Sequence, residues 1–373
     1  MRRTRGWAAR GPASWHVVEL ERRDLRPEDI AVRVDYCGVC HSDLHALHEH
    51  AQKTASSEGS EGSEGSEGPF VPGHECTGIV TEVGTEVTRF AVGDTVAVGN
   101  IVDACLGCDM CTAGQENYCR EFPTLTYGGV DRHDGTPTLG AFARELIVRE
   151  EFAHHLPSGL DPAAAAPLLC AGVTVWEPLR ALDVGPGTHL AVVGLGGLGH
   201  LAVKLAVALG AEVTVLSRSA AKAADARRLG AHHLLVSTDE AAMTRARGRF
   251  DVILDTVAVE HDLAPLLELL TLDGALSQVG YLGPISLETL SLLMGRRKLT
   301  SAGSGGMAGT AQMLEFCAEH GVVADIELLP SSRIDEAFAR LARGDVRYRG
   351  VLDLSDLEPD TAGITAPSPL PGR

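Results

Sequence analysis

The chain has 373 residues, of which 45% are hydrophobic, and a formal net charge of −18 from 32 basic and 50 acidic side chains. This length predicts two domains, or three. The acidic balance argues against broad nucleic-acid binding, which needs a basic surface. The sequence contains no run of about 18 uncharged apolar residues, so we expect no membrane span. No apolar segment follows the basic start at residues 1–5, so we expect no secretory signal.

The chain contains nine cysteines, an odd number, and several of them are closely spaced. Without a secretory signal, such cysteines indicate a reducing compartment, here the cytoplasm. They also favour metal or thiol chemistry over a disulfide framework. These cysteines are therefore candidate metal ligands.

The first part of the chain has the sequence pattern of β structure. Residues 26–36 alternate apolar and polar side chains from Ile30 and predict a strand, which runs into CGVCH at 37–41. The Ser-Glu-Gly repeat at 56–68 has nothing to bury, so we expect a flexible surface loop and assign it no function. Residues 78–83 and 94–99 predict two further short strands.

The pattern then changes from β structure to alternating strands and helices. Residues 163–182 are rich in Ala and Leu and predict a helix. The further predicted strands are 189–193, 212–217, 251–255 and 275–280, and the helices between them lie after 199, at 220–231 and at 262–270. This alternation predicts an α/β unit with a doubly wound parallel sheet. The tail at 357–373 is rich in Pro, Ser and Gly, and we expect it to be disordered.

A glycine-rich turn follows the strand at 189–193 and opens a helix. Its sequence, Gly194-Leu195-Gly196-Gly197-Leu198-Gly199, fits the dinucleotide-binding pattern in the required strand–turn–helix context. The glycines allow a tight turn, close approach of the pyrophosphate and close packing of the helix, whose N-terminus attracts phosphate. The alternative is a glycine-rich turn that binds no ligand.

The next strand ends at Ser217, where NAD-binding proteins commonly carry an acidic residue that binds the ribose 2′-hydroxyl. This chain instead has Ser217-Arg218-Ser219 and then Lys222. Hydroxyls and cations would hold a 2′-phosphate, which a carboxylate would repel. We therefore predict a preference for NADP(H), the alternative being that Arg218 and Lys222 are solvated residues at the start of a helix.

Four cysteines form one compact motif at Cys105, Cys108, Cys111 and Cys119. This close spacing suits a closed tetrahedral Zn²⁺ site with a structural role, and an iron–sulfur cluster is the alternative. A second, dispersed set comprises Cys40, His74 and Cys170, which would leave a fourth zinc position for water or substrate. Cys170 alone, in an apolar run, would more commonly be a core residue.

Several strings in the chain resemble those of the zinc-dependent medium-chain dehydrogenases, most closely the cinnamyl-alcohol-dehydrogenase type with its bacterial broad-range aldehyde reductases. The matching strings are CGVCHSDLH (37–45), PGHE (72–75), VGD (92–94), the four-cysteine loop, AAAAPLLCAGVT (163–174), VGLGGLGH (193–200) and GDVRYR (344–349). The resemblance implies a GroES-like β-rich catalytic domain at 1–161, a Rossmann NADP-binding domain at 162–302 and a return to the catalytic domain at 303–356. It also implies a homodimer.

The resemblance assigns a role to each matching residue. Cys40, His74 and Cys170 would bind the catalytic zinc, with Glu75 close behind the metal and Asp43 orienting the His74 ring. Ser42 would bond the substrate oxygen, and His45 would pass the proton towards solvent. Cys37 and Cys76 match positions that are not ligands. The cofactor-binding positions are Thr174, Gly194, Gly196, Gly197, Leu198, Gly199, Ser217, Arg218, Ser219, Lys222, Thr256, Val279 and Gly280.

The sequence departs from its relatives after His45. Similar enzymes carry a pocket-lining aromatic residue in this loop, and the stretch 46–52 has none. We expect His48 and His50 to be exposed loop residues, and His200 either to contact a phosphate or to face solvent. The segment 301–304 and Gly350 also differ from the commoner pattern. These changes leave the substrate open.

Taken together, these features predict a zinc-dependent NADP(H) oxidoreductase that interconverts primary alcohols and aldehydes of aromatic or medium size. The alternatives within the superfamily are a polyol-type dehydrogenase and a reductase of specialised metabolism. A zinc-ribbon module that grips nucleic acid is opposed by the net charge of −18.

Overall fold

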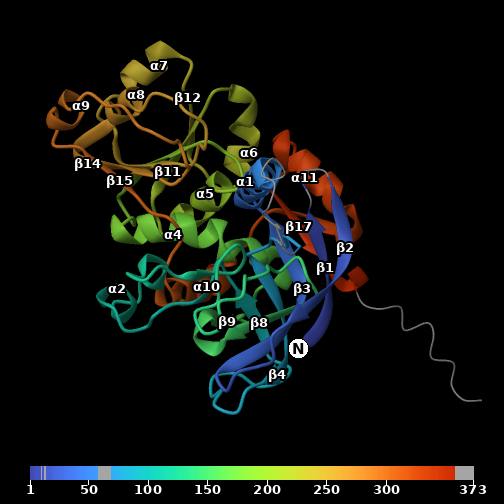
Figure 1. Ribbon diagram of the computed structural model, residues 1–373. Helices are drawn as coiled ribbons and strands as arrows, with labels where there is room; N and C mark the ends of the chain where they lie inside the picture. Colours follow the sequence, from blue (N-terminus) through green and yellow to red (C-terminus); the bar gives the residue numbers. More distant parts are fainter. Residues whose placement is uncertain (10, 12–13, 58–68, 358–373) are drawn as a thin grey trace, which may run out of the picture.

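The computed structural model describes residues 1–9, 11, 14–57 and 69–357. Most of the Ser-Glu-Gly repeat and all but the first residue of the expected disordered tail therefore lie outside the described residues. The chain forms a β-rich part and an α/β part that lie side by side (Figure 1). Within the described residues, the helices are too short or too polar to cross a lipid bilayer.

A seven-stranded sheet forms the centre of the β-rich part. Its order is β16-β17-β3-β4-β5-β9, and β8 also pairs with β3. The bounds are β3 Asp29–Val39, β4 Cys76–Val83, β5 Thr95–Val98, β8 Glu145–Arg149, β9 Ala153–His155, β16 Ile326–Pro330 and β17 Arg349–Asp353. A β1–β2 hairpin (Arg2–Ala9 and Trp15–Arg22) and a small β6–β7 pair (Ile101–Asp103 and Thr124–Leu125) complete this part.

The two ends of the chain meet in this sheet. Strand β17 pairs antiparallel with β3, with Gly350 opposite Val39 and Leu352 opposite Cys37. Figure 1 shows the red C-terminal strands beside the blue N-terminal ones. The pairing brings Arg349, at the start of β17, close to the end of β3, where Cys40 follows.

The second sheet has six parallel strands in the order β12-β11-β10-β13-β14-β15. Numbered from β10, this is the 3-2-1-4-5-6 order of a Rossmann fold, with its topological switch between β10 and β13. The bounds are β10 His189–Val193, β11 Glu212–Ser217, β12 His233–Val236, β13 Phe250–Asp255, β14 Leu270–Gln278 and β15 Lys298–Ser301. The predicted α/β class with a GroES-like part and a Rossmann part is confirmed.

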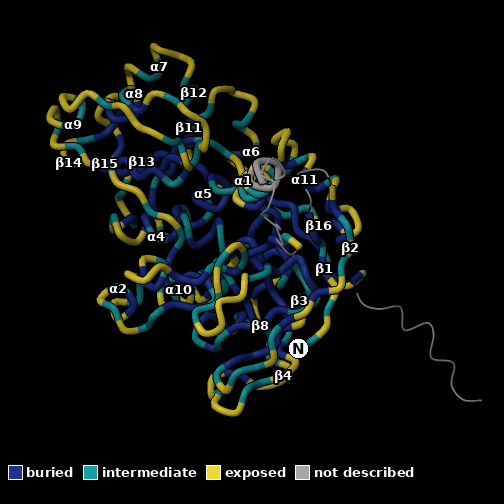
Figure 2. The backbone as a smooth tube through the Cα atoms, in the orientation of Figure 1, coloured by how far each residue is buried: buried dark blue, intermediate teal, exposed yellow. Residues whose placement is uncertain are grey.

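Both faces of this sheet are covered, as an all-parallel sheet requires. Alternate side chains of β10 enter two different cores: Leu190 and Val192 one of them, Ala191 and Val193 the other. Figure 2 shows these inner strands buried and the outer helices α7 (Glu240–Arg245) and α9 (Leu290–Leu293) largely exposed. The first core also takes in Met313 and Cys317 of α10 (Met307–His320), which therefore packs on the α/β part.

Several helices differ from those predicted. The expected helix at 163–182 is broken into α3 (Pro162–Ala165), a 3₁₀ turn (Ala166–Leu169) and α4 (Ala171–Ala181). Pro167 removes an N–H, and Cys170 stands between the pieces with non-helical φ −126° and ψ −75°. The stretch after His45, expected to be a loop, belongs to helix α1 (His41–Ser57).

Other boundaries also shift. The helix predicted at 220–231 is a 3₁₀ turn, Ala220–Lys222, followed by α6 (Ala223–Arg228), and the one at 262–270 shortens to α8 (Ala264–Leu267) because β14 already begins at Leu270. The β1–β2 hairpin had no counterpart in the sequence prediction. Helix α5 (Gly199–Ala208) follows the glycine-rich turn as expected, and α11 (Ile334–Ala342) packs against the β-rich part.

Candidate active site

Three of the dispersed candidate ligands converge where the two parts meet. The ligand atoms of Cys40, His74 and Cys170 all lie within 4.8 Å of one another. The Cys40 and Cys170 sulfurs are 3.7 Å apart, and His74 Nε2 lies 3.2 Å from the Cys170 sulfur. Two thiols and one imidazole around a single point match a zinc site with one position left open. The break before α4 is what lets the Cys170 side chain reach this point.

The His74 ring is held from behind by Asp43 of α1. Asp43 Oδ1 lies 3.0 Å from His74 Nδ1, and the same carboxylate accepts backbone N–H groups of Gly73 and Cys40 at 3.1 and 2.9 Å. The Asp43 carboxylate is fully buried. A carboxylate on Nδ1 leaves Nε2 free to act as a ligand, which is the usual arrangement around zinc-bound histidine.

A buried ion pair lies next to these ligands. Arg349 Nη2 donates to Glu75 Oε2 at 3.2 Å, and both side chains are at least 96% buried. Burial raises the pKa of Glu75 to about 7, against the opposing effect of Arg349. Although burial opposes its charge, the negative Glu75 and Cys40 groups raise the pKa of Arg349. The hydrogen bond from Cys170, together with Arg349, lowers the pKa of Cys40 well below its usual value.

Ser42 and His45 lie on the exposed side of the candidate metal ligands. Ser42 Oγ is 3.2 Å from His74 Nε2, so its hydroxyl borders the open position. His45 follows three residues later on α1 and therefore lies on the same helix face. Both side chains are exposed, which places them between the ligands and solvent.

An aromatic group that was not predicted from the sequence borders the same site. The Tyr127 ring lies 5.6 Å from the His74 ring and 5.8 Å from Phe70, which stacks on His50 at 4.7 Å. His50 is half-buried in this stack, so the expectation of an exposed loop residue is wrong for it, whereas His48 is exposed. Burial and the nearby Asp43 carboxylate raise the pKa of Tyr127 well above its usual value. Phe70 and Tyr127 thus supply aromatic rings where the stretch after His45 has none.

The four-cysteine motif forms a separate, compact lobe. The sulfurs of Cys105, Cys108, Cys111 and Cys119 all lie within 4.8 Å of one another. Backbone N–H groups of Cys108 and Arg120 donate to the Cys105 and Cys108 sulfurs, both at 3.4 Å. Four converging sulfurs leave no open position and fit a structural zinc. Cys37 and Cys76, in contrast, are fully buried opposite each other in β3 and β4, outside both ligand groups.

The glycine-rich turn has the shape that a bound pyrophosphate needs. Gly194 has φ +88°, and a Cβ on Gly199 would lie 2.3 Å from the Gly194 carbonyl oxygen, so larger residues are excluded at both positions. A Cβ on Gly196 would meet nothing within 4 Å, which leaves open space over the turn. Gly197 faces the Arg349 side chain: a Cβ added to Gly197 would lie 3.1 Å from the Arg349 Cδ. Leu198 precedes α5 without a side-chain cap, so the helix N-terminus is free to receive phosphate.

The residues expected to choose the cofactor lie at the end of β11. The Gly194 N–H donates to the Leu216 carbonyl at 3.0 Å, so Ser217 follows directly beside the glycine-rich turn. Ser219 caps the next turn by accepting the Ala221 N–H at 3.2 Å. Arg218 is exposed and Lys222 half-buried, and neither forms an ion pair within the described part of the chain.

The remaining candidate cofactor positions, apart from Thr174, follow β13 and β14 at the carboxyl edge of the parallel sheet. Thr256 follows β13 and donates its hydroxyl to the Val193 carbonyl at 2.8 Å. Val279 and Gly280 follow β14, where a Cβ on Gly280 would lie 2.2 Å from the Val257 carbonyl oxygen. Thr174 lies in the first turn of α4 and donates its N–H to the Cys170 carbonyl at 3.0 Å. Ligands of open α/β sheets bind at this edge.

His200, in α5, neither faces solvent nor is available to a phosphate. Its side chain is fully buried, stacks on Tyr348 at 5.0 Å, and accepts the Asp325 N–H on Nε2 at 3.2 Å. Its Nδ1 lies 3.1 Å from the Gly196 carbonyl and donates to it. Both earlier expectations for this residue are therefore wrong, because the C-terminal strands cover the helix start.

Burial, with Arg349 nearby, lowers the pKa of His200 from 6.5 to about 3. Between these values the unfolded chain binds a proton that the folded chain does not, so stability falls as the pH drops from 6.5 towards 3. This costs roughly 1.4 kcal/mol per pH unit. We expect the Tm of His200→Gln to fall less than that of the wild type between pH 6.5 and 4. Parallel Tm curves would contradict this, and His155→Gln at the surface is the control.

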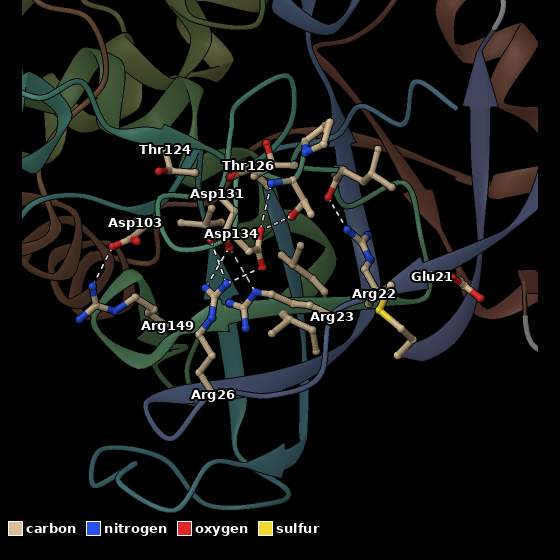
Figure 3. A pocket seen from close by; sticks show the side chains of 18 residues that line it. Glu21, Arg22, Arg23, Arg26, Asp103, Thr124, Thr126, Asp131, Asp134 and Arg149 are labelled. Atoms are coloured by element: carbon tan, nitrogen blue, oxygen red, sulfur yellow. Dashed lines mark hydrogen bonds and ion pairs between the residues drawn. The ribbon is translucent and has the colours of Figure 1, made fainter. Parts of the chain in front are cut away.

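A separate cavity of about 270 Å³ contains none of the candidate metal ligands (Figure 3). Several of its charged residues pair with each other: Arg26 with Asp131 at 2.9 Å and with Asp134 at 2.7 Å, and Arg149 with Asp103 at 2.8 Å. Arg22 instead donates to the backbone carbonyls of Leu139 and Gly140. These pairs satisfy the cations that an anionic ligand would need. We infer that the ion pairs around this cavity have a structural role and connect the segments of the β-rich part.

Comparison with known proteins gives this geometry its family context. Residues 26–158 match the family described as "Alcohol dehydrogenase GroES-like domain", and 197–319 match "Zinc-binding dehydrogenase". This chain belongs to the zinc-binding alcohol dehydrogenases. It is 44% identical to a probable formaldehyde dehydrogenase of Bacillus subtilis, over 92% of this chain and 95% of the relative. It is 46% identical to an NADP-dependent alcohol dehydrogenase C of Mycolicibacterium smegmatis, over 91% and 94%.

Solved structures agree with the family assignment. A cinnamyl alcohol dehydrogenase from Sorghum bicolor superimposes with a TM-score of 0.86 at 42% identity, covering 94% of this chain and 98% of that one. The NADP(H) complex of a cinnamyl alcohol dehydrogenase from Helicobacter pylori gives 0.82 at 34% identity, covering 94% and 98%. The predicted resemblance is confirmed.

Two residues at this alcohol dehydrogenase site had no predicted role. Arg349 ends the string GDVRYR and is followed directly by an apolar strand. A charged residue at the start of an apolar strand was the one sign in the sequence that Arg349 could have a role. Tyr127 left no signal, because its approach to His74 depends on how the loop after β7 returns to the ligands.

Proposed function

We propose that this protein is a zinc-dependent NADP(H) oxidoreductase that interconverts primary alcohols and aldehydes of aromatic or medium size. The observation that carries the proposal is the Cys40–His74–Cys170 cluster. It lies beside the Glu75–Arg349 pair, and the Arg349 side chain also packs against Gly197 of the glycine-rich turn. The names of the relatives, among them NADP-dependent alcohol dehydrogenases and cinnamyl alcohol dehydrogenases, support the same reaction class.

The residues of the site have separate tasks in this reaction. Bound zinc supplies Lewis-acid polarisation of the substrate oxygen, and the nicotinamide supplies or accepts the hydride. Ser42 accepts the proton of the substrate hydroxyl at its Oγ while it gives up its own hydroxyl proton towards His45, and His45 releases a proton to solvent. Asp43 keeps the His74 ring fixed, so the position of the reacting carbon relative to the nicotinamide is set in advance. Phe70 and Tyr127 offer apolar faces to an aromatic or medium-sized substrate.

The test is the initial rate of NADPH oxidation with cinnamaldehyde, before and after removal of zinc by a chelator. The expected result is a rapid rate that the chelator abolishes and that added zinc restores. A protein with two zincs per chain that binds NADPH but reduces neither cinnamaldehyde nor medium-chain aldehydes would contradict the proposed substrate class.

The end of β11 supports the proposed preference for NADP(H). We expect Arg218→Ala to lower kcat/KM for NADPH by roughly tenfold, because one charge-assisted contact to the 2′-phosphate is lost. The value for NADH should stay unchanged, and Arg227→Ala, an exposed arginine of the same region, serves as the control. A wild-type kcat/KM for NADH equal to that for NADPH would contradict the assignment.

We further propose the domain division 1–161, 162–302 and 303–356 and a homodimer formed through the edge strand β15. Beside this edge, Leu290, Leu293 and Met294 are 61, 71 and 64% exposed, an apolar surface that pairing would cover. Light scattering should give twice the chain mass, and Leu293→Asp should shift the protein towards the monomer. A monomeric wild type would contradict the dimer.

All nine cysteines are free, which supports a reducing, cytoplasmic location.

A further inference from the structure

The four-cysteine lobe makes a close contact with the start of helix α10. The Glu116 carboxylate, only 8% exposed, accepts the backbone N–H of Met307 at 2.8 Å, and Met307 is the first residue of α10. Glu116 lies between Cys111 and Cys119 and follows the short helix α2 (Asp109–Thr112). One end of this contact is therefore fixed by the sulfur cluster.

Several neighbouring contacts make the same connection. The Gly303 N–H donates to the Tyr118 hydroxyl at 3.3 Å, and the Ser304 hydroxyl donates to Asn100 Oδ1 at 3.0 Å. A Cβ on Gly306 would lie 1.9 Å from the Gly114 carbonyl oxygen, so the two backbones touch. The segments 114–118 and 303–307 therefore form one tight seam.

The 303–307 segment of the seam is connected to the candidate reaction site in two ways. The first is β15, which pairs Ser301 with Gln278, so 302–304 leave the carboxyl edge of the sheet beside the candidate cofactor positions Val279 and Gly280. The position of the end of β15 therefore depends on the contacts that fix residues 303–307 in the seam.

The second connection is helix α4. A Cβ on Gly305 would lie 2.5 Å from both Glu177 and Val173, so the start of α10 also packs without space against α4. Helix α4 begins directly after Cys170 and carries Thr174. A displacement of the start of α10 would therefore shift the start of α4, and with it the candidate metal ligand Cys170 and the candidate cofactor position Thr174.

We propose that Glu116 is a positioning residue, which clamps the four-cysteine lobe to the start of α10 and so sets the nicotinamide side of the site. This inference rests on the proposed function and adds to it a task for the lobe beyond holding a structural metal. The physical basis is the location of a buried carboxylate at a helix N-terminus, where it satisfies an otherwise free N–H and interacts favourably with the helix dipole.

The test compares Glu116→Ala with Glu116→Gln, which keeps an acceptor oxygen. Loss of a helix cap predicts a roughly tenfold decrease in kcat/KM for Glu116→Ala and a weaker Kd for NADPH, with most of the loss recovered in Glu116→Gln. Zinc content should stay at the wild-type value. Glu121→Ala is the matched control, because Glu121 lies in the same lobe but is exposed, and its ion-pair partner among the described residues is Arg132.

A lower Tm with unchanged NADPH affinity and kcat/KM would overturn the proposal, and so would loss of a zinc in Glu116→Ala, because Glu116 would then act by holding the metal. If Glu116→Ala fails to fold, Tyr118→Phe removes only the hydroxyl that Gly303 donates to, and a smaller loss in the same direction is expected. Failure of the proposed function would appear separately, as inactive wild-type enzyme, while the NADPH Kd values would still test the clamp.

Discussion

Replacing Cys40 with alanine is expected to lower kcat by at least about a thousandfold, because a metal that polarises the substrate oxygen contributes several kcal/mol to the reaction. Cys40 is one of three converging candidate ligands, and the loss of its sulfur leaves His74 and Cys170 to hold the ion. Two ligands do not maintain a tetrahedral zinc site. Elemental analysis should therefore show one zinc per chain in the variant instead of two.

The NADPH Kd should change little in Cys40→Ala, because the glycine-rich turn and the end of β11 are separate from the ligand sulfurs. Cys317→Ala is the matched control: Cys317 is a fully buried thiol in the core around α10, outside both ligand groups. Retained activity, or retention of both zincs, in Cys40→Ala would refute the metal assignment.

The second large effect is expected at Arg349. The Arg349→Met substitution leaves Glu75 in a fully buried position without its cation, and breaking a buried ion pair in this way costs roughly 3–5 kcal/mol. For a chain of 373 residues, this corresponds to a decrease in Tm of about 4–6 °C. The variant should also bind NADPH more weakly, because the Arg349 side chain packs against Gly197 of the glycine-rich turn.

A double substitution separates the lost pair from lost packing. In Arg349→Met combined with Glu75→Gln no buried charge is left unpaired, so most of the Tm should return while NADPH binding stays weak. Calorimetry and NADPH fluorescence titration on Arg349→Met, Glu75→Gln, the double variant and the wild type give the coupling. Additive Tm losses in the double variant would show that Arg349 and Glu75 act independently and would contradict the ion-pair argument.

The sequence by itself determined the features whose parts lie close together along the chain. The glycine-rich turn needs only a strand, six residues and a helix, and the structure has β10, the turn and α5 in that order. The four cysteines span fifteen residues, so local folding alone can bring their sulfurs together. The alternation of strands with helices likewise predicted a parallel sheet, because parallel neighbours need a crossover connection, which is usually a helix.

Only the tertiary structure decided how distant residues meet. Cys40 and Cys170 are 130 residues apart and Arg349 and Glu75 are 274 apart, and these contacts depend on the pairing of β17 with β3 and on the break before α4. The same packing buries His200. From the sequence, its place in the helix after the glycine-rich turn is equally compatible with a solvent-exposed side chain. Local preference fixes a turn or a helix, but the partner of a side chain is fixed by which elements cover it, and this requires the complete fold.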